Sequence, residues 1–367
     1  MTNQKAKNTS YRPLPLQAAL QEYSSIWTEF IEANRTNISK LPFWVEAAAR
    51  SHDLFDEVMV LLWPGDTGDI HGLIPVRIHN RSMTGIPLKT LEIGAGLVGY
   101  HQDWLGLCDV PNAFDDLVYH AHDNRCDALH FPGISHGSRS FEILKERSDD
   151  AFSVILGDGE ISPVLKIESD WDNYLAGCAK KWRYLIKKML KSIEENPQLE
   201  TRWITQADDL DELFENILYI EARSWKADEG TAITPDSLEY RYYQHLLPSL
   251  ANAGALAANV INYSGTPVAY NLCYLWNGEM GSMKTSFDQA HANLSPGTLA
   301  YCTSVRYAFE HGAHSYDFLG DRAQHKTKWT SHLIHHSDFL FLLPTPASRL
   351  ARALRSVSLP LRSLLRR

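Results

Sequence analysis

The sequence predicts a mixed α/β protein made of two consecutive units. The chain has 367 residues, which is enough for about two domains of ordinary size. Its residues are 44% hydrophobic and 22% charged, so we expect a packed core rather than disorder. Helix-like and strand-like segments alternate in both halves, and this alternation favours sheets covered by helices.

The first unit, expected over residues 1–160, begins with amphipathic helical spacing and continues with short apolar runs. A turn at 64–68 separates the first two of these runs, as expected for neighbouring buried strands. The expected helices are 17–34, 43–51 and 113–125, and the expected strands are 58–63, 72–78, 88–93, 103–107 and 128–131.

The second unit, expected over residues 161–346, contains one long helix at 171–195 that Pro197 ends. Trp182, Ile186 and Met189 fall on one apolar face of this helix. The basic residues of the opposite face are Lys180, Lys181, Arg183, Lys187, Lys188 and Lys191. This face is either a solvated surface or a guide for an anionic substrate or an RNA backbone. The other expected helices are 208–226, 236–250 and 298–311, and the expected strands are 162–167, 201–204, 256–262, 267–276, 281–286, 316–319 and 333–343.

Charge is unevenly distributed along the chain. The net charge is −9, which disfavours general nucleic-acid binding. After Asp338 there is no acidic residue and there are six arginines, whereas residues 1–338 hold 29 basic and 44 acidic residues. The tail at 347–367 is therefore either a basic amphipathic helix for an anionic membrane surface or a frayed solubilising end.

Several classes of protein are not expected. No run of about 18 apolar residues indicates a membrane-spanning helix, and the N-terminus lacks the pattern of a secretion signal. Five cysteines occur without a CxxC pair, which fits a reducing cytoplasm rather than a disulfide framework. The 16 histidines include no HExxH motif, so no metal site is expected. We expect a cytoplasmic protein, peripheral at the inner membrane if its tail binds lipid.

The segment Ser295-Pro296-Gly297-Thr298 lies between an expected strand and an expected helix. Ser suits the N-cap, Pro the first helical position, and Gly the close approach of a ligand to the backbone. A helix N-terminus can hold a phosphate or a carboxylate. The alternative is an ordinary capped helix.

Two further segments combine carboxylates with cations. Glu221 and Lys226, with Trp225 between them, precede a Gly-containing loop and suit substrate positioning or proton transfer, unless they form a solvated surface pair. Asp317 and Asp321 end an expected strand, where ligands often bind. Lys326, which follows them, suits a phosphate or an oxyanion, unless the segment is a salt-bridged loop.

In this order, the segments resemble a known family. Those that carry the resemblance are 42–44, 72–76, 171–191, 221–232, 294–299 and 316–321, with Lys326 and Trp329. Together they resemble the GNAT-related (CelD-like) acetyltransferases of bacterial cellulose and exopolysaccharide loci, relatives of the Fem peptidyltransferases. The resemblance implies two tandem GNAT-like (acyl-CoA N-acyltransferase) domains, the first degenerate and the second catalytic.

The resemblance also implies a reaction and its residues. Acyl-CoA, as the acetyl ester (acetyl-CoA), would be the co-substrate, with no permanently bound cofactor. The acceptor would be an amine of a cell-envelope, polysaccharide or small-metabolite precursor. The implied catalytic residues are Glu221, Asp317 and Lys326, the donor-binding residues are Ser295, Pro296, Gly297 and Thr298, and the substrate-binding residues are Trp225, Lys226, Lys284, Asp288 and His291.

Two alternatives stay open. The segment 295–298 differs from the usual Q/R-x-x-G-x-G/A loop, and Fem-type relatives take their acyl group from aminoacyl-tRNA. An aminoacyl-tRNA-dependent transferase is therefore the second hypothesis, and tRNA is the one nucleic-acid partner expected. A non-catalytic adaptor at an envelope synthase is the third.

Overall fold

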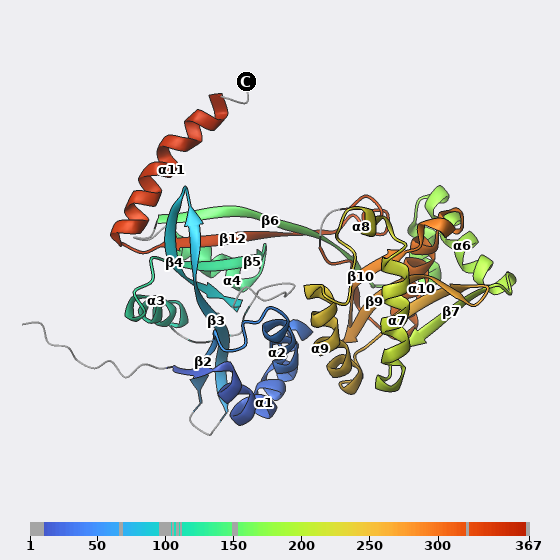
Figure 1. Ribbon diagram of the computed structural model, residues 1–367, viewed down its shortest axis with the longest axis horizontal. Coiled ribbons are helices and arrows are strands. Elements are labelled where there is room, and N and C mark those ends of the chain that lie inside the picture. Colours follow the sequence, from blue (N-terminus) through green and yellow to red (C-terminus); the bar gives the residue numbers. More distant parts are fainter. Residues whose placement is uncertain are drawn as a thin grey trace, which may run out of the picture. The chain divides into compact units, whose positions relative to one another are not determined.

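The computed structural model describes residues 11–65, 69–94, 104, 106–107, 110, 112–148, 153–320 and 323–364. The chain forms two compact units (Figure 1). The first unit holds residues 1–49, 53–160 and 335–367, and the second holds 161–334 together with 50–52. Residues 335–346, expected in the second unit, therefore belong to the first, because their strand pairs with a strand of that unit at His336↔Ser135.

The first unit is a sheet flanked by helices. Its strands follow the order β1-β2-β3-β4-β5-β12-β6, in which β4 and β5 run parallel. The strands are β1 (Arg12–Pro15), β2 (Val58–Pro64), β3 (Ile70–Met83), β4 (Ile86–Ile93), β5 (Ala128–Ser135), β12 (Leu333–Leu342) and the first half of β6 (Ser153–Lys166). The helices are α1 (Leu16–Ala33), the short η1 (Ile38–Lys40), α2 (Pro42–Ser51), α3 (Ala113–Asp123), α4 (Arg139–Ser148) and α11 (Pro346–Leu364).

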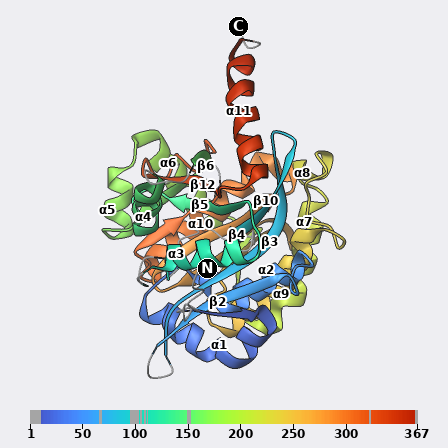
Figure 2. The same cartoon turned by 90° about the vertical axis from the view of Figure 1, so that its left-hand side faces the viewer.

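Helix α11 contains most of the basic tail, so of the two alternatives that the sequence left open the structure shows the helix. Figure 2 shows it projecting from the sheet of the first unit, beside the hairpin of β3 and β4. Ala351 packs inward, whereas Leu350 and Leu354 are 51% and 41% exposed. The tail therefore presents apolar and basic side chains together.

Sequence reasoning missed four elements of the first unit: β1, the short η1, α4 and the start of β6. Helix α4 has only Ser140 and Leu144 buried, so its apolar periodicity is too weak to predict a helix. Of the strand expected at 103–107, Asp103 and Leu105 lie outside the described residues, and Gly106 and Leu107 form a turn.

The second unit has the strand order β6-β11-β10-β9-β8-β7, in which β10 and β11 run parallel. The strands are the second half of β6, β7 (Leu199–Ile204), β8 (Ala258–Tyr263), β9 (Thr266–Trp276), β10 (Glu279–Phe287) and β11 (Ser315–Asp317). The helices are α5 (Trp171–Gly177), α6 (Lys180–Glu195), the short η3 (Ala207–Asp209), α7 (Leu210–Glu221), α8 (Trp225–Asp228), α9 (Leu238–Asn252), the short η4 (Gln289–Leu294) and α10 (Pro296–Glu310).

Helices α7 and α10 cover opposite faces of this sheet. Tyr270 of β9 hydrogen-bonds Glu221 of α7, and the next residue, Asn271, hydrogen-bonds Ser304 of α10. Successive side chains of a strand point to opposite faces. The apolar face of α6 packs beside α10, with Ile186, Met189 and Leu190 buried in the same core, as the sequence predicted.

Two predicted helices are interrupted. The segment 171–195 is two helices, because Cys178 and Ala179 have extended backbone angles after Gly177. The segment 208–226 ends at Glu221, where the Ser224 amide (3.2 Å) and hydroxyl (2.9 Å) both donate to the Glu221 carbonyl. These two hydrogen bonds end α7 about one turn before Lys226, so Trp225 and Lys226 lie on the separate helix α8.

Within the described part of the chain, no helix has the combination of length and apolar character that crossing a bilayer requires.

Candidate functional site

The candidate site lies where the parallel strands β10 and β11 separate. Their pairing covers three residues and ends at Gly281↔Asp317. Beyond this point the Phe318 amide donates to the Pro163 carbonyl at 3.1 Å, so the chain leaves β10. Strand β10 also carries a bulge between Ser282 and Lys284. Among described residues, its edge from Ser282 onward has no ladder partner on the β11 side, and this carboxyl-terminal end of a parallel pair is a common place for ligands.

A buried amide holds this opening from beneath. Asn271 Oδ1 accepts hydrogen bonds from the Ser282 and Thr285 hydroxyls, both at 2.7 Å. Its Nδ2 donates to Ser304 Oγ at 3.0 Å and to Tyr316 Oη at 3.1 Å. All four hydrogen-bonding positions of the amide are thus used, which ties β9, β10, α10 and β11 together. Sequence reasoning missed Asn271, although a polar residue inside an apolar strand was a visible signal.

Glu221 is fully buried at the end of α7. Its Oε1 accepts from Tyr270 Oη at 2.5 Å and from Lys226 Nζ at 3.2 Å, and its Oε2 accepts from the Ile233 amide at 3.0 Å. A buried carboxylate needs such partners to remain charged. The carboxylate therefore joins α7, α8, β9 and the loop that begins at Gly230.

Lys226 connects this carboxylate to the opening. Its Nζ donates to Glu221 and, at 2.8 Å, to the Thr285 carbonyl of β10, so two of its three N–H groups are used. Its side chain is 12% exposed. Burial lowers the pKa of Lys226, the nearby Lys284 lowers it further, and Glu221 partly opposes both effects. Lys284 itself bonds both carboxylate oxygens of Glu239, at 2.9 and 2.7 Å.

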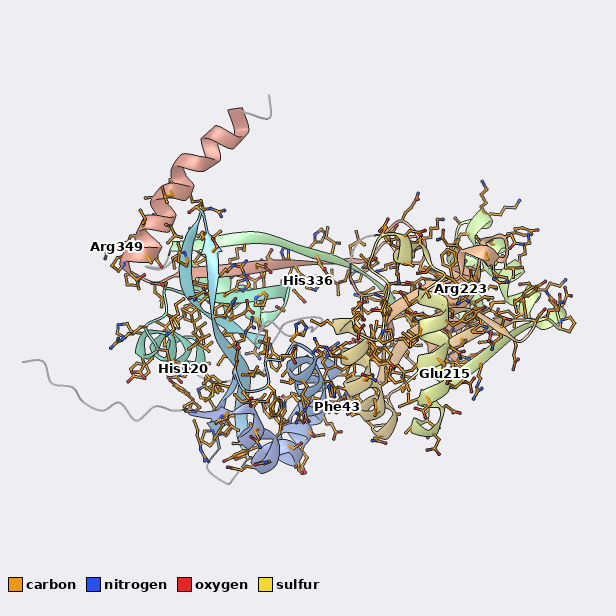
Figure 3. All side chains as sticks on the ribbon, in the orientation of Figure 1. Phe43, His120, Glu215, Arg223, His336 and Arg349 are labelled. Carbon is orange, nitrogen blue, oxygen red and sulfur yellow. The ribbon has the colours of Figure 1, made fainter. Side chains whose placement is uncertain are left out.

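Asp288 and His291 lie just after β10. Asp288 is 3% exposed and accepts from the Ala290 amide at 2.9 Å. Its other oxygen lies 3.4 Å from His291 Nδ1, and the imidazole side chain is 29% exposed. The Gln289 amide donates at 3.1 Å to the carbonyl of Arg223, at the end of α7 (Figure 3). The structure thus brings this pair to the same end of the sheet as Glu221 and Lys226.

The segment 295–298 starts α10 with Pro296 at the first position, as expected. Ser295 takes left-handed angles, and its carbonyl, not its hydroxyl, accepts from Thr298 and Leu299 at 2.9 and 3.1 Å. The side-chain cap predicted for Ser295 is therefore absent. At Gly297, a Cβ atom would meet the Phe287 ring at 3.1 Å, so part of the need for glycine comes from packing.

Asp317 and Lys326 form a second group on the β11 side. Asp317 is 2% exposed, and its Oδ1 accepts from the Leu319 amide at 2.8 Å. Lys326 Nζ donates to the Leu319 carbonyl at 2.5 Å. Leu319 has φ of 46°, so these two bonds hold a left-handed turn directly after the strand. Asp321 lies outside the described residues, and Trp225 is 45% exposed.

A groove of about 970 Å³ lies in the same unit, between α5, α6 and the segment after Lys326. Trp182 and Trp329 meet edge to face at 5.0 Å, and Lys328 Nζ lies 5.7 Å from the Trp182 ring centre. Tyr184 at the groove is 68% exposed. Trp329 stacks on Phe318, next to Asp317, so the groove borders the β11 side of the site. Sequence reasoning missed the groove, because its two walls are about 150 residues apart.

Metal ligands were not found: the described residues hold no group of three or more His, Cys, Asp or Glu side chains that could bind an ion.

Residues 180–327 match the sequence profile of the acetyltransferase (GNAT) domain. No curated protein matches the chain. Among solved structures, FemX is 13% identical with a TM-score of 0.59 over 86% of this chain and 94% of that one. The C-terminal domain (DUF2156) of a putative lysylphosphatidylglycerol synthetase from Agrobacterium fabrum is 13% identical, with a TM-score of 0.54 over 92% and 96%. L-PGS from Bacillus licheniformis is 9% identical, with a TM-score of 0.53 over 91% and 97%.

At these identities the structural likeness concerns the fold alone. The mixed α/β class is confirmed, and so is a GNAT-type acyltransferase fold in the second unit. The narrower resemblance to the cellulose-locus branch stays a prediction.

Proposed function

We propose that this protein is an N-acyltransferase that moves an acyl group from acyl-CoA to an amine, at the opening between β10 and β11. The observation that carries the proposal is the edge of β10 from Ser282 to Phe287, which has no described strand partner on the β11 side and runs toward the start of α10. The pantetheine arm of acyl-CoA contains amides that suit such an edge. Its phosphates suit the helix N-terminus at 295–298.

The groove supports a donor that carries adenosine and phosphate. Its walls are aromatic, from Trp182, Tyr184 and Trp329, and its rim holds Lys181 and Lys328. Aromatic rings stack on a purine, and ammonium groups attract phosphate. CoA offers both groups.

The acceptor amine must lose a proton as it attacks. His291 is the first candidate base, because Asp288 faces its Nδ1 and the ring is partly exposed. Asp317, across the opening, is the second. The amine nitrogen bonds to the thioester carbon, the C–S bond breaks, and the CoA thiolate takes up a proton.

Lys226 is the candidate group for the oxyanion, since one N–H remains after its bonds to Glu221 and Thr285. Glu221 is then a positioning residue that fixes this ammonium, and Lys284 adds positive charge beside it. Lys326 would hold the turn after β11. Trp225 would contact substrate from α8.

The acceptor class follows from the expected family only: an amine of a cell-envelope, polysaccharide or small-metabolite precursor. The enzyme would work in the cytoplasm, where acyl-CoA is available, and α11 would allow a peripheral position at the inner membrane.

An aminoacyl-tRNA-dependent transferase is the second candidate, on the evidence of α6. Lys180, Lys181, Lys187, Lys188 and Lys191 are all exposed on this one helix. An RNA backbone would suit this face. The fold likeness to FemX and to the putative lysylphosphatidylglycerol synthetase domain, over most of the chain, agrees with this candidate. The same groove would then take the terminal adenosine of the tRNA.

The test is calorimetric titration of the full chain with acetyl-CoA, longer acyl-CoAs, free CoA and bulk tRNA. Saturable binding of CoA esters that Gly297→Asp weakens at least tenfold supports the first candidate. No CoA binding, with tRNA binding that falls steeply with salt, replaces it with the second. Binding of neither refutes both and favours a non-catalytic adaptor.

A second measurement separates binding from chemistry. With an amine acceptor in hand, His291→Gln should lower kcat at least a hundredfold and leave the donor Kd within about twofold. An unchanged kcat would remove His291 from the role of base.

A further inference from the structure

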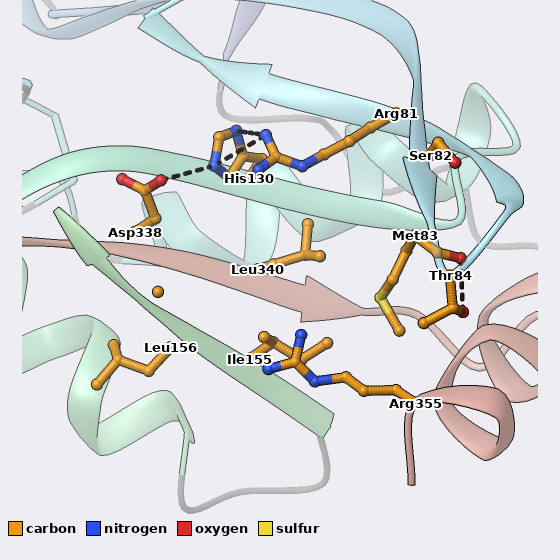
Figure 4. A pocket seen from close by; sticks show the side chains of 11 residues that line it. Arg81, Ser82, Met83, Thr84, His130, Ile155, Leu156, Asp338, Leu340 and Arg355 are labelled. Atoms are coloured by element: carbon orange, nitrogen blue, oxygen red, sulfur yellow. Dashed lines mark hydrogen bonds and ion pairs between the residues drawn. The ribbon is translucent and has the colours of Figure 1, made fainter. Parts of the chain in front are cut away.

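Cavities outside the proposed site differ in whether their polar groups are already bonded. A pocket of about 500 Å³ beside Arg81 and Arg355 is enclosed by five elements of the first unit: the end of β3 with the following turn, β5, the first half of β6, β12 and α11 (Figure 4). A guanidinium nitrogen of Arg81 lies 3.2 Å from His130 Nδ1, and Asp338 accepts from the Gly133 amide at 2.7 Å. The polar groups of this wall bond within the protein, so they do not indicate a ligand.

A smaller pocket, of about 210 Å³, lies in the second unit between α6, α10 and the edge strand β7. Three of its lining residues come from α6, two from β7 and four from α10: Leu190, Ile193, Glu194, Thr201, Trp203, Thr303, Arg306, Tyr307 and Glu310. None of them belongs to the opening between β10 and β11 or to the groove beside Trp182. The pocket is therefore separate from the proposed reaction, and its ligand can be tested whether or not that reaction is correct.

One side of the pocket is apolar and largely aromatic. The rings of Trp203 and Tyr307 stack with their centres 3.9 Å apart and their planes 27° apart. Leu190 and Ile193 of α6 add aliphatic surface. Apolar carbon of a ligand would be removed from water on this side.

The rim of the pocket is polar, and its charged groups hold one another. Arg306 Nε donates to Glu310 at 2.7 Å, and a second nitrogen of the same guanidinium donates to Glu194 at 3.5 Å. A phosphate or carboxylate would have to compete with both of these carboxylates for Arg306. The rim therefore suits a neutral ligand that can both donate and accept hydrogen bonds.

Thr201 supplies the observation that indicates a ligand. Its hydroxyl oxygen is buried and has no hydrogen-bond partner among the described residues. Trp203, two residues along the strand, pairs with Asn259 of β8. Asn259 Nδ2 donates to Thr303 of α10 at 2.6 Å, so these side chains share the face of the sheet that α10 covers. A buried hydroxyl that makes no bond costs free energy, and a ligand that bonds to Thr201 would recover this cost.

We propose that this pocket binds one pyranose ring of a neutral sugar, with the C–H face of the ring on the aromatic side and its hydroxyl groups on Thr201 and the rim. Each sugar hydroxyl can donate to one group and accept from another, which matches a wall made of a hydroxyl, carboxylates and a guanidinium. The C–H groups of the ring carry partial positive charge and suit the negative face of an aromatic ring. The volume is below the range of about 300–1,000 Å³ that is usual for drug-sized ligands and suits a single sugar ring.

The test is a saturation-transfer NMR titration of the full chain with the methyl glycosides of glucose, galactose, mannose and N-acetylglucosamine. Glycerol and cyclohexanol are the control compounds, because the first has hydroxyl groups without a ring and the second has a ring with one hydroxyl. At least one glycoside should bind saturably, with a Kd of about 1 mM and at least tenfold more tightly than either control. Saturable binding of none of the four glycosides, or equal affinity for cyclohexanol, overturns the proposal.

A matched pair of threonine variants locates the binding. Thr201→Val removes the unbonded hydroxyl and keeps the shape of the side chain, whereas Thr205→Val removes a hydroxyl just after β7, outside the pocket. The glycoside that binds best to wild type should bind at least fivefold more weakly to Thr201→Val and within twofold of wild type to Thr205→Val. Unchanged affinity in Thr201→Val, or an equal loss in both variants, refutes the site.

The stability of Thr201→Val is an independent readout. Because the Thr201 hydroxyl has no partner in the part of the chain that the structure describes, its removal should leave the urea midpoint unchanged or raise it. A clearly lower midpoint would show that the hydroxyl bonds within the protein, and this would remove the argument for a ligand there.

Tyr307→Leu and Tyr184→Leu test the aromatic side. Tyr307 lines the pocket, whereas Tyr184 is 68% exposed on α6 and lines the other groove. Tyr307→Leu should weaken binding of the glycoside at least tenfold, and Tyr184→Leu should leave it unchanged. Equal losses would indicate general adhesion to exposed aromatic rings and contradict the proposal.

Discussion

Replacing Glu221 with Gln should destabilise the second unit by about 3–5 kcal/mol, the usual cost of breaking a buried ion pair. The carboxylate is fully buried and receives three donors, from Tyr270, Lys226 and the Ile233 amide. Gln has nearly the same shape but one acceptor oxygen, so one donor would face its NH₂ group. Lys226 would lose its counter-charge. The lower end applies if Lys226, which is 12% exposed, turns toward water while keeping its bond to Thr285.

Urea unfolding of a double-mutant cycle measures this effect. The cycle contains wild type, Glu221→Gln, Lys226→Met and the double variant, which removes both charges. The losses in free energy of unfolding caused by the two single changes should sum to at least about 1 kcal/mol more than the loss caused by the double change. Glu215→Gln is the matched control, because Glu215 is an exposed carboxylate on the same helix (Figure 3) and should cost less than about 0.5 kcal/mol. Hydrogen exchange of the segment around Ile233 localises the loss.

The pH dependence gives an independent check. The pKa of Lys226 is lower in the folded state than its ordinary value. At pH values between the two, the unfolded state therefore holds more protons than the folded state. Stability should therefore rise with pH through that window in wild type and not in Lys226→Met. The reasoning is refuted if Glu221→Gln costs no more than Glu215→Gln, or if the two single changes are additive.

Four further outcomes are expected. Burial lowers the pKa of His130, but its hydrogen bonds with Asp338 and Glu92 outweigh this effect and raise it. The contacts with His130 lower the pKa values of Glu92 and Asp338. The stability lost in His130→Asn should therefore be greatest between the ordinary pKa values of a carboxyl group and of histidine, at about pH 5–6.5. The loss should shrink as pH rises through the raised pKa of His130 or falls through the lowered pKa values of Glu92 and Asp338. Urea midpoints at pH 4, 6 and 9 will measure this. Burial raises the pKa of both Cys273 and Cys302 to about 12, so a disulfide reagent at pH 8 should label Cys178, which is partly exposed, before either, by mass spectrometry. Gly297→Ala should keep most of the acyl-CoA affinity, because its Cβ needs only a small shift of the Phe287 ring, whereas Gly297→Asp should lose that affinity in the same titration. An equal loss of affinity in both variants would show that packing against Phe287 requires glycine at this position. Replacing Leu350 and Leu354 by Ser, or deleting 347–367, should weaken binding to anionic vesicles about tenfold, and unchanged binding would remove the tail from membrane contact.

Local patterns in the sequence were sufficient for most helices and strands. The apolar face of α6 and its exposed lysines follow from spacing along one helix, and so does the amphipathic tail. Helix ends were less predictable. The closure of α7 depends on Ser224 turning back to Glu221, and the break at Cys178 depends on two residues with extended angles.

The candidate site was only partly visible. Glu221 and Lys226 were singled out because a carboxylate and a cation precede a Gly-containing loop, but their partners Tyr270, Ile233 and Thr285 come from elsewhere in the chain. Asn271 was missed because its role needs four partners on three other elements. A single sequence does not contain those pairings.

By itself, then, the sequence determined the mixed α/β class, the order of most of its elements and the residue types that each segment carries, because side-chain periodicity and turn residues act over short stretches of chain. Only the tertiary structure decided that β10 and β11 part after three residues, that the chain returns to the first unit at His335, and that five elements enclose the pocket beside Arg81 and Arg355. These features arise from pairing between distant segments, where strand register and side-chain packing, rather than local propensity, set the geometry.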